Sequence, residues 1–117
     1  MTITNALASV AVRDLTAATT FYERFLGPGR RPMDEVVERQ LDGGGGLQLY
    51  LLPERAGSCS CTLIVTDIDE TAEKLRSSGV APGAEPSRSE RVDTLMIKDP
   101  DGNSIAFSRP KDPTLAH

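Results

Sequence analysis

The sequence contains the same pattern twice, and this internal repeat constrains the fold more than any other feature. Residues 10–27 (VAVRDLTAATTFYERFLG) align with residues 64–79 (IVTDIDETAEKLRSSG). Residues 45–51 (GGLQLYL) align in the same way with residues 102–108 (GNSIAFS), and their hydrophobic positions are in phase. A unit that recurs after more than about 50 residues indicates two copies of one supersecondary motif.

Each copy is predicted to form a strand, a helix and then about three strands. In the first copy we expect a strand over 6–12, a helix over 15–26, an extended stretch over 33–41 and a strand over 47–52. In the second we expect a strand over 59–65, a helix over 68–78, and strands over 92–98 and 103–108. Apolar residues at helical spacing indicate the helices, and Asp14 and Asp67 precede them as N-caps. Alternating strands with a helix on one side predict an α+β fold.

A single ferredoxin-like unit is the competing architecture, and it would have fewer strands after each helix. The strands on both sides of the glycine-rich turn at 43–46, together with the final hairpin around DPDG at 99–102, count against it. We therefore expect one domain over 1–110, with modules at about 4–53 and 59–109. The segment 111–117 is expected to be a C-terminal tail with little to pack against.

The charge balance and the apolar pattern exclude several classes of partner. Thirteen basic and seventeen acidic residues give a net charge of −4 without a basic stripe, which argues against nucleic acid and anionic membranes. No apolar run is long enough to span a membrane, and the N-terminus lacks the features of a signal peptide. Cys59 and Cys61 are two residues apart, a poor spacing for a disulfide on a strand. These observations predict a cytoplasmic protein with reduced thiols.

Three motifs, in this order and spacing, resemble the vicinal oxygen chelate superfamily. They are V-x-V-x-D-L followed by FYERFLG (10–27), VTDID (65–69) and DPDGNSI (99–105). That superfamily includes glyoxalase I, extradiol dioxygenases, and bleomycin and fosfomycin resistance proteins. The resemblance covers nearly the whole chain. It implies two βαβββ modules that curl into a cup-shaped mixed sheet with the helices outside, and it implies a homodimer.

Metal-using members of that superfamily place His, Glu, His and Glu on four strands that face the cup. The matching positions here are Leu7, Gln48, Ser60 and Ala106. None of them carries a carboxylate or an imidazole, and the only histidine is the terminal His117. If a strand were assigned one residue out of register, its opposite face would line the cup. Among the residues on those opposite faces, only the two cysteines could bind a metal. We therefore expect no metal site and no cofactor.

The cup lining follows from strand alternation. We predict the ligand-binding residues to be Leu7, Ser9, Gln48, Tyr50, Ser60, Thr62, Met96 and Ala106. A lining that is small, neutral and mixed suits a small neutral or aromatic organic ligand. The alternative, that these residues simply fill the cup or a dimer interface, has equal weight. Tyr50 is the best single candidate for stacking on a ligand or bonding to it, although it could also pack at the rim.

Catalytic candidates are few, and we assign none. Glu38 and Glu90 are the only acidic residues expected near the cup, and neither has a visible partner. Cys59 and Cys61 have no histidine to activate them. A buried Glu38 or an unusually acidic thiol would favour an enzyme.

The leading hypothesis is a metal-independent small-molecule binding protein, similar to the drug-sequestering bleomycin resistance proteins. With no Trp, two Tyr and three Phe, the chain offers little stacking surface, which indicates a smaller ligand. One alternative is a lyase, isomerase or dioxygenase that uses side chains or, with less support, a metal. The other is a structural module with a collapsed cup.

Overall fold

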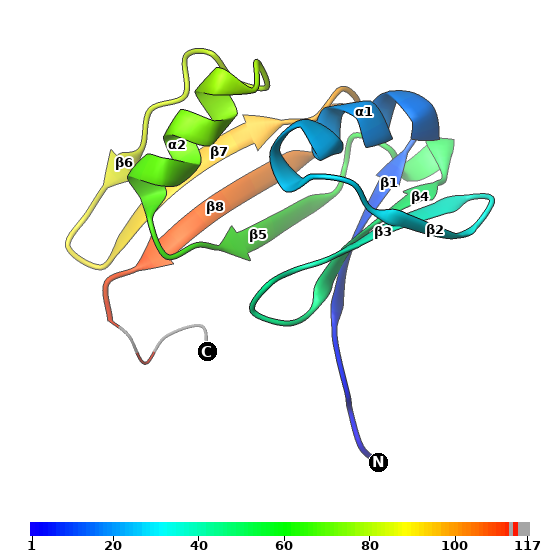
Figure 1. Ribbon diagram of the computed structural model, residues 1–117, viewed down its shortest axis with the longest axis horizontal. Helices are drawn as coiled ribbons and strands as arrows, with labels where there is room; N and C mark the ends of the chain where they lie inside the picture. Colours follow the sequence, from blue (N-terminus) through cyan, green and yellow to red (C-terminus); the bar gives the residue numbers. More distant parts are fainter. Residues whose placement is uncertain (113, 115–117) are drawn as a thin grey trace.

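The computed structural model describes residues 1–112 and 114, and it contains two copies of one motif in succession (Figure 1). The first copy, module 1, consists of β1 (Leu7–Val12), α1 (Leu15–Leu26), β2 (Arg30–Met33), β3 (Val36–Gln40) and β4 (Gly46–Leu51). A short 3₁₀ turn, η1 (Pro53–Arg55), leads into module 2, which consists of β5 (Ser60–Ile64), α2 (Ile68–Ser77), β6 (Ser87–Arg88), β7 (Val92–Lys98) and β8 (Ser104–Pro110). The predicted α+β fold with two βαβββ modules is confirmed.

The two modules have the same strand topology. The strand order is β1-β4-β3-β2 in one sheet and β5-β8-β7-β6 in the other. The first and last strands of each module pair in parallel, whereas the remaining pairs are antiparallel. Both helices lie along the same side of the molecule (Figure 1), and both sheets remain open. Among the described residues, no helix is long and apolar enough to cross a membrane.

The stretch predicted as extended over 33–41 contains β3, but the prediction missed β2, which precedes it and forms a hairpin with it. The chain turns at residues 34 and 35 between the two strands. Strand β2 reads RRPM and is exposed at every position, so it has no alternation of apolar and polar residues to reveal it. Proline is tolerated there because β2 lies at the edge of its sheet. The two-residue strand β6 was missed for the same reason, since both of its residues are exposed.

One hydrophobic core runs under both helices. Its strand residues are Val10, Val12, Leu47, Leu49, Leu63, Leu95, Ile97, Ile105 and Phe107. The aromatic stripe of α1 belongs to this core, and Phe25 reaches Phe107 of module 2 with ring centroids 5.9 Å apart. Leu51 continues the alternation of Leu47 and Leu49, but it is 40% exposed. Alternation assigns a side chain to a face, but it does not say how far along the strand that face is covered.

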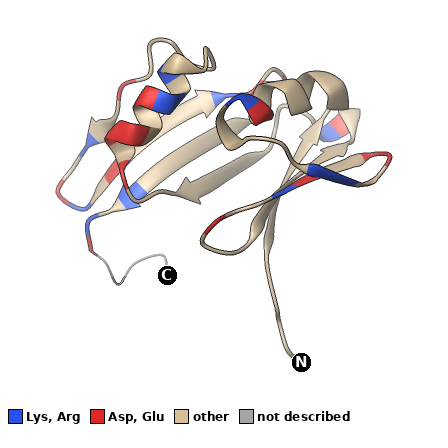
Figure 2. Cartoon of the chain, in the orientation of Figure 1, with Lys and Arg blue, Asp and Glu red and all other residues tan. Residues whose placement is uncertain are grey.

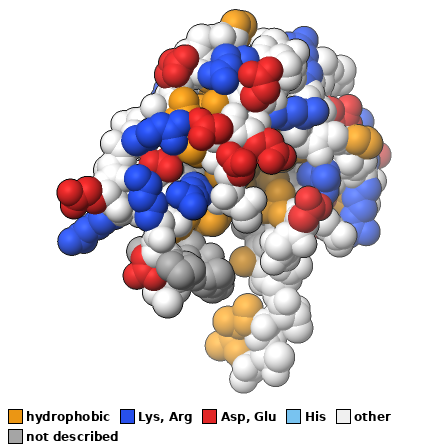
Figure 3. All heavy atoms as spheres, turned by 60° about the vertical axis from the view of Figure 1, so that its left-hand side comes forward, with side chains coloured by type: hydrophobic (Ala, Val, Ile, Leu, Met, Phe, Trp, Pro, Cys, Tyr) orange, Lys and Arg blue, Asp and Glu red, His pale blue; other side chains and the backbone are white. Residues whose placement is uncertain are grey.

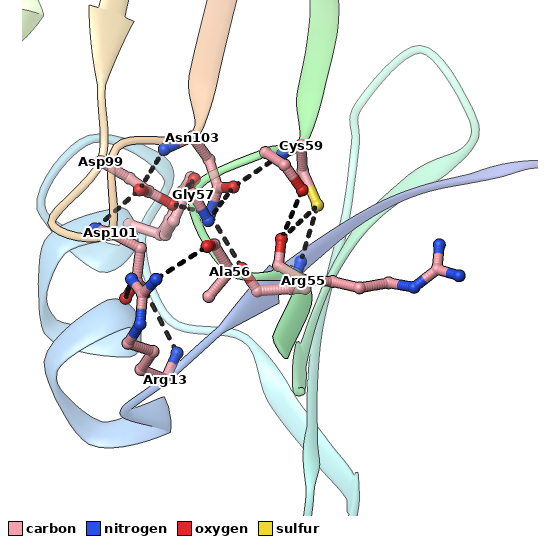
Figure 4. Close-up of polar contacts among 11 residues, drawn as sticks. Arg13, Arg55, Ala56, Gly57, Cys59, Asp99, Asp101 and Asn103 are labelled. Carbon is pink, nitrogen blue, oxygen red and sulfur yellow. Dashed lines mark hydrogen bonds and ion pairs between the residues drawn. The ribbon is translucent and has the colours of Figure 1, made fainter. Parts of the chain in front are cut away.

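The junction between the modules depends on Asn103, which is fully buried (Figure 4). Its Oδ1 accepts hydrogen bonds from the backbone N–H groups of Gly57 (2.8 Å) and Cys59 (2.9 Å). Its Nδ2 donates to the Ala11 carbonyl and to Asp99 Oδ2, both at 2.8 Å. Every hydrogen-bonding position of the amide is therefore used, and one side chain connects β1, the linker and the DPDG turn.

Asp99, at the start of that turn, is also buried, and it extends the network to α1. Its Oδ1 accepts hydrogen bonds from the backbone N–H groups of Asp101 and Asn103, both at 2.9 Å. Its Oδ2 accepts a bond of 2.9 Å from the Tyr22 hydroxyl. On the surface, Arg13 forms an ion pair of 3.1 Å with Asp101. Module 1 thus holds the final turn of module 2 through charge and hydrogen bonds as well as through apolar packing.

We predict that Asn103→Ala lowers the free energy of unfolding by about 3 kcal/mol or more, because it leaves two backbone N–H groups and a carbonyl without partners. Urea denaturation measures this loss. Asn5→Ala is the matched control, since among the described residues the Asn5 side chain accepts a hydrogen bond only from the adjacent Ala6 N–H, at an exposed site. Equal losses in the two variants would contradict the role of Asn103.

The buried Tyr22 hydroxyl makes the free energy of unfolding depend on pH in the alkaline range. Burial, followed by the charge of and the hydrogen bond to Asp99, raises the pKa of the Tyr22 hydroxyl well above its ordinary value. Above about pH 10 the unfolded chain loses this proton while the folded protein keeps it. The free energy of unfolding should then fall by up to about 1.4 kcal/mol per pH unit from this group.

Tyr22→Phe should remove that contribution to the pH dependence, although it also removes the bond to Asp99 and lowers stability at neutral pH. Melting temperatures of both proteins between pH 7 and 11 test this, because groups that titrate in both proteins cancel in the difference. Parallel curves would show that Tyr22 does not contribute.

Candidate functional site

The eight predicted ligand-binding residues all lie on the side of the sheets that faces away from the helices, which we call the open face. Their neighbours along each strand are the buried core residues, so alternation places these eight on the opposite side. They are Leu7, Ser9, Gln48 and Tyr50 in module 1, and Ser60, Thr62, Met96 and Ala106 in module 2. Each is exposed or half-buried in this chain. Their role as ligand contacts remains a prediction.

In module 1, strand register joins two of these residues to two that were not assigned. Ser9 pairs with Gln48, Gln48 pairs with Glu38, and Glu38 pairs with Arg30. Directly paired residues project from the same side of a sheet. The four side chains therefore form a continuous row across β1, β4, β3 and β2, which we call the polar row.

Module 2 carries two further rows on its open face. One consists of Ser60, Ser104 and Lys98, and the other of Thr62, Ala106 and Met96. Lys98 Nζ donates to Ser104 Oγ at 2.6 Å. Thr62, Ala106 and Met96 are therefore brought together as neighbours, whereas Ser9 and Gln48 form their group on the other sheet.

Charged residues are distributed unevenly over the sheets. Strands β1, β4 and β5 contain none, and the charges lie on the helices, the other five strands and the loops (Figure 2). On the outer side of module 2, basic and acidic side chains alternate without forming a patch of one sign (Figure 3). The centre of the open face is neutral, as predicted, but Glu38, Arg30 and Lys98 add charge at its margins. The position of Lys98 on the open face could have been predicted, because it continues the strand alternation after Met96. The position of Arg30 could not, because it depends on the pairing of a strand that the sequence did not reveal.

A groove of about 740 Å³ lies between the modules. It is lined by Leu7 on one side, by Thr62 and Ile64 on the other, and by the glycine turn at 43–46. Of the eight predicted residues, only Leu7 and Thr62 line it. A volume of this size falls within the range of small-molecule sites. Its exposed apolar side chains include Leu7 at 42% and Ile64 at 50%.

The residues at the four superfamily metal positions do not fit a divalent cation. Leu7 and Ala106 have no donor atom in their side chains, and Gln48 and Ser60 offer only neutral oxygen. Within residues 1–112 and 114, no group of three His, Cys, Asp or Glu side chains could hold a metal ion. His117 lies outside the described residues.

The cysteines and glutamates differ in how far they support catalysis. Cys59 and Cys61 are free thiols that pack against the core rather than on the open face. Burial, the nearby Asp99 and Cys59 raise the pKa of the Cys61 thiol, which disfavours the thiolate that a nucleophile needs. Glu90 is exposed in the loop before β7. Glu38 is the exception, because its side chain is only 16% exposed.

We expect Cys61 to react slowly with a disulfide reagent. In a Cys59→Ser variant, the remaining thiol should react with 5,5′-dithiobis(2-nitrobenzoate) at pH 8 about tenfold more slowly than glutathione, because less thiolate is present. Unfolding in urea should remove the difference. A folded protein that reacts faster than glutathione would restore Cys61 as a nucleophile.

Comparison with known proteins identifies a family. The model of the glyoxalase/bleomycin resistance protein/dioxygenase superfamily matches residues 4–107. This confirms the resemblance inferred from the three motifs. Among curated proteins, none matches the chain.

Solved structures give the same result. A glyoxalase/bleomycin resistance protein from Catenulispora acidiphila DSM 44928 is 34% identical, with a TM-score of 0.74, over 90% of this chain and 96% of that one. TnmS3, an antibiotic binding protein from Streptomyces sp. CB03234, is 26% identical, with a TM-score of 0.74, over 94% and 98% of the two chains. A bleomycin-binding protein in complex with bleomycin also has a TM-score of 0.74, over 94% and 100% of the two chains, but at 22% identity this likeness shows the fold alone.

Proposed function

The chain belongs to the glyoxalase/bleomycin resistance protein/dioxygenase superfamily, and from this premise we propose that it binds a small organic molecule on its open face without a metal ion. The observation that carries this proposal is the open face itself. Its central strands present small and neutral side chains that the chain leaves uncovered, beside a groove of about 740 Å³. The antibiotic-binding relative supports small-molecule binding at the level of the family.

The side chains at the superfamily metal positions support sequestration of a ligand rather than metal-assisted chemistry. A metal-dependent lyase or dioxygenase of this superfamily needs carboxylate and imidazole ligands, and the matching positions hold Leu7, Gln48, Ser60 and Ala106. Two of these side chains could still contact an organic ligand by hydrogen bonds, and two by van der Waals contact. The ligand would be held by shape and a few polar groups.

We further propose that the protein acts as a homodimer. Met96 is 66% exposed on the open face, and Leu7 and Ile64 are also uncovered. Apolar side chains clustered on one face typically mark an interface or a ligand site. A second copy placed against this face would enclose the ligand between the two chains. The free thiols fit a reducing cytoplasm.

One observation favours a second candidate function, a metal-independent lyase or isomerase. Glu38 is a largely buried carboxylate on the open face and could act as a general base. Arg30 is the only other titratable residue in the polar row. The polar row contains no general acid that could return the proton, so binding remains the better supported function.

Native mass spectrometry of untagged protein, purified without added metal, tests the proposal. We expect a dimer free of stoichiometric divalent metal, with or without an organic adduct of small mass. A stoichiometric metal would overturn the metal-independent site, and a monomer would overturn the shared pocket.

Blocking the open face tests where the ligand binds. A ligand found by thermal-shift screening should stabilise the wild type by about 2.7 kcal/mol at a hundredfold excess over Kd. Ala106→Trp, in the row between Thr62 and Met96, should abolish this shift by filling the face. Thr16→Trp, on the exposed side of α1, is the matched control and should preserve it. An unchanged shift in Ala106→Trp would place the ligand elsewhere.

A further inference from the structure

We propose that Glu38 is the charged recognition residue of the open face and selects organic ligands that carry a protonated amine. This inference rests on the proposed function, because it assigns a chemical class to the ligand of that same face. It is carried by the position, the burial and the incomplete hydrogen bonding of one carboxylate.

The position of Glu38 follows from strand register. Glu38 pairs with Gln48 on the inner side and with Arg30 on the outer side. It therefore lies within the polar row, between the neutral centre of the sheet and its edge. On the inner side, β4 and, beyond it, β1 contain no charged residue, so no other charge on those two strands competes for the ligand.

Glu38 is largely buried, but one of its oxygens is left without a donor from the described residues. Its side chain is 16% exposed. An ionised carboxylate can accept about four hydrogen bonds. Within the part of the chain that the structure describes, it receives one, from Arg30 Nη2 to Oε1 at 3.3 Å. Its Oε2 receives no hydrogen bond from the described residues but is not among their buried unsatisfied atoms. This oxygen therefore remains accessible to solvent, and a ligand N–H donor can reach it.

Arg30 does not block this role. Its side chain is 68% exposed and approaches Glu38 through a single nitrogen. Because the Arg30 end of this pair is screened by water and its long side chain loses entropy on pairing, the arginine is held only weakly. Strand β2 lies at the edge of the sheet, where the arginine has room to turn outward. A ligand ammonium can thus join Arg30 at the carboxylate or replace it.

The surroundings favour an amine with an apolar body. Gln48 and Ser9 extend the row toward the sheet centre and supply an amide and a hydroxyl for neutral polar groups. Tyr50, on the same face two residues from Gln48, offers a ring. Lys98 would suit an anionic ligand, but it is exposed and already donates to Ser104. The observations therefore support Glu38 more strongly than Lys98 as the charged residue that recognises the ligand.

Two probes that differ in one group test the inference. They are 2-phenylethylamine, which is protonated at pH 7, and 2-phenylethanol, which is neutral and of similar size. Titration of each into ¹⁵N-labelled full-length protein, followed by amide shifts of Ser9, Glu38 and Gln48, gives the two affinities. The variants are Glu38→Gln, which removes the charge but keeps the shape, and Arg30→Gln, which removes the competing cation. Glu35→Gln, in the exposed turn before β3, is the matched control.

We expect the wild type to bind the amine more tightly than the alcohol. Glu38→Gln should weaken amine binding about tenfold, a typical loss for one charge-assisted hydrogen bond. Arg30→Gln should strengthen it, and Glu35→Gln should leave it unchanged. The alcohol should bind all four proteins alike, provided that their melting temperatures show that they fold.

The outcomes separate this inference from the proposed function. Equal binding of the amine to wild type and Glu38→Gln would overturn the role of Glu38 while leaving a binding face in place. Weaker amine binding in Arg30→Gln would also overturn it, because the arginine would then be helping rather than competing. If neither probe shifts the open-face amides, both the inference and the fragment-binding face on which it rests fail.

Discussion

The buried amide of Asn103 is the interaction on which the rest of the structure depends. A polar group without access to water is costly unless every donor and acceptor is satisfied. The Asn103 amide makes all its hydrogen bonds only when β1, the linker before β5 and the DPDG turn hold these positions relative to one another (Figure 4). Apolar packing between α1 and β8 supplies attraction, but it tolerates sliding. The hydrogen bonds therefore set how the two modules meet.

That arrangement determines which side chains the protein leaves uncovered. With both helices on one side, all large apolar strand residues of the core turn toward them. The side that faces away keeps small, neutral and half-exposed side chains, and the groove opens where β1 and β5 diverge. The neutral centre of this face is the basis of our proposal that an organic molecule binds here. Glu38, Arg30 and Lys98 carry charge at the margin of the face, and Arg109 and Asp112 line the groove.

The candidate site was predictable in part. Strand alternation placed all eight proposed contact residues on the open face, because a period of two needs only local sequence. It did not place Arg30 beside Glu38, since their pairing belongs to a hairpin whose outer strand is exposed on both sides. The burial of Glu38 was equally hidden, because it depends on the two strands that pair with β3. The side of the sheet on which the eight residues lie was thus predictable, whereas their role as ligand contacts stays a prediction.

The sequence by itself determined the repeat, the two capped helices, the DPDG turn and the superfamily. These features depend on residues close together in the chain: Asp14 and Asp67 cap the helices that follow them, and Gly102 closes a turn that begins at Asp99. Only the tertiary structure decided that Asn103 joins the modules, that Leu51 remains exposed and that Glu38 is largely buried. Each of these depends on groups brought together from distant segments, and no local pattern records which segments those are.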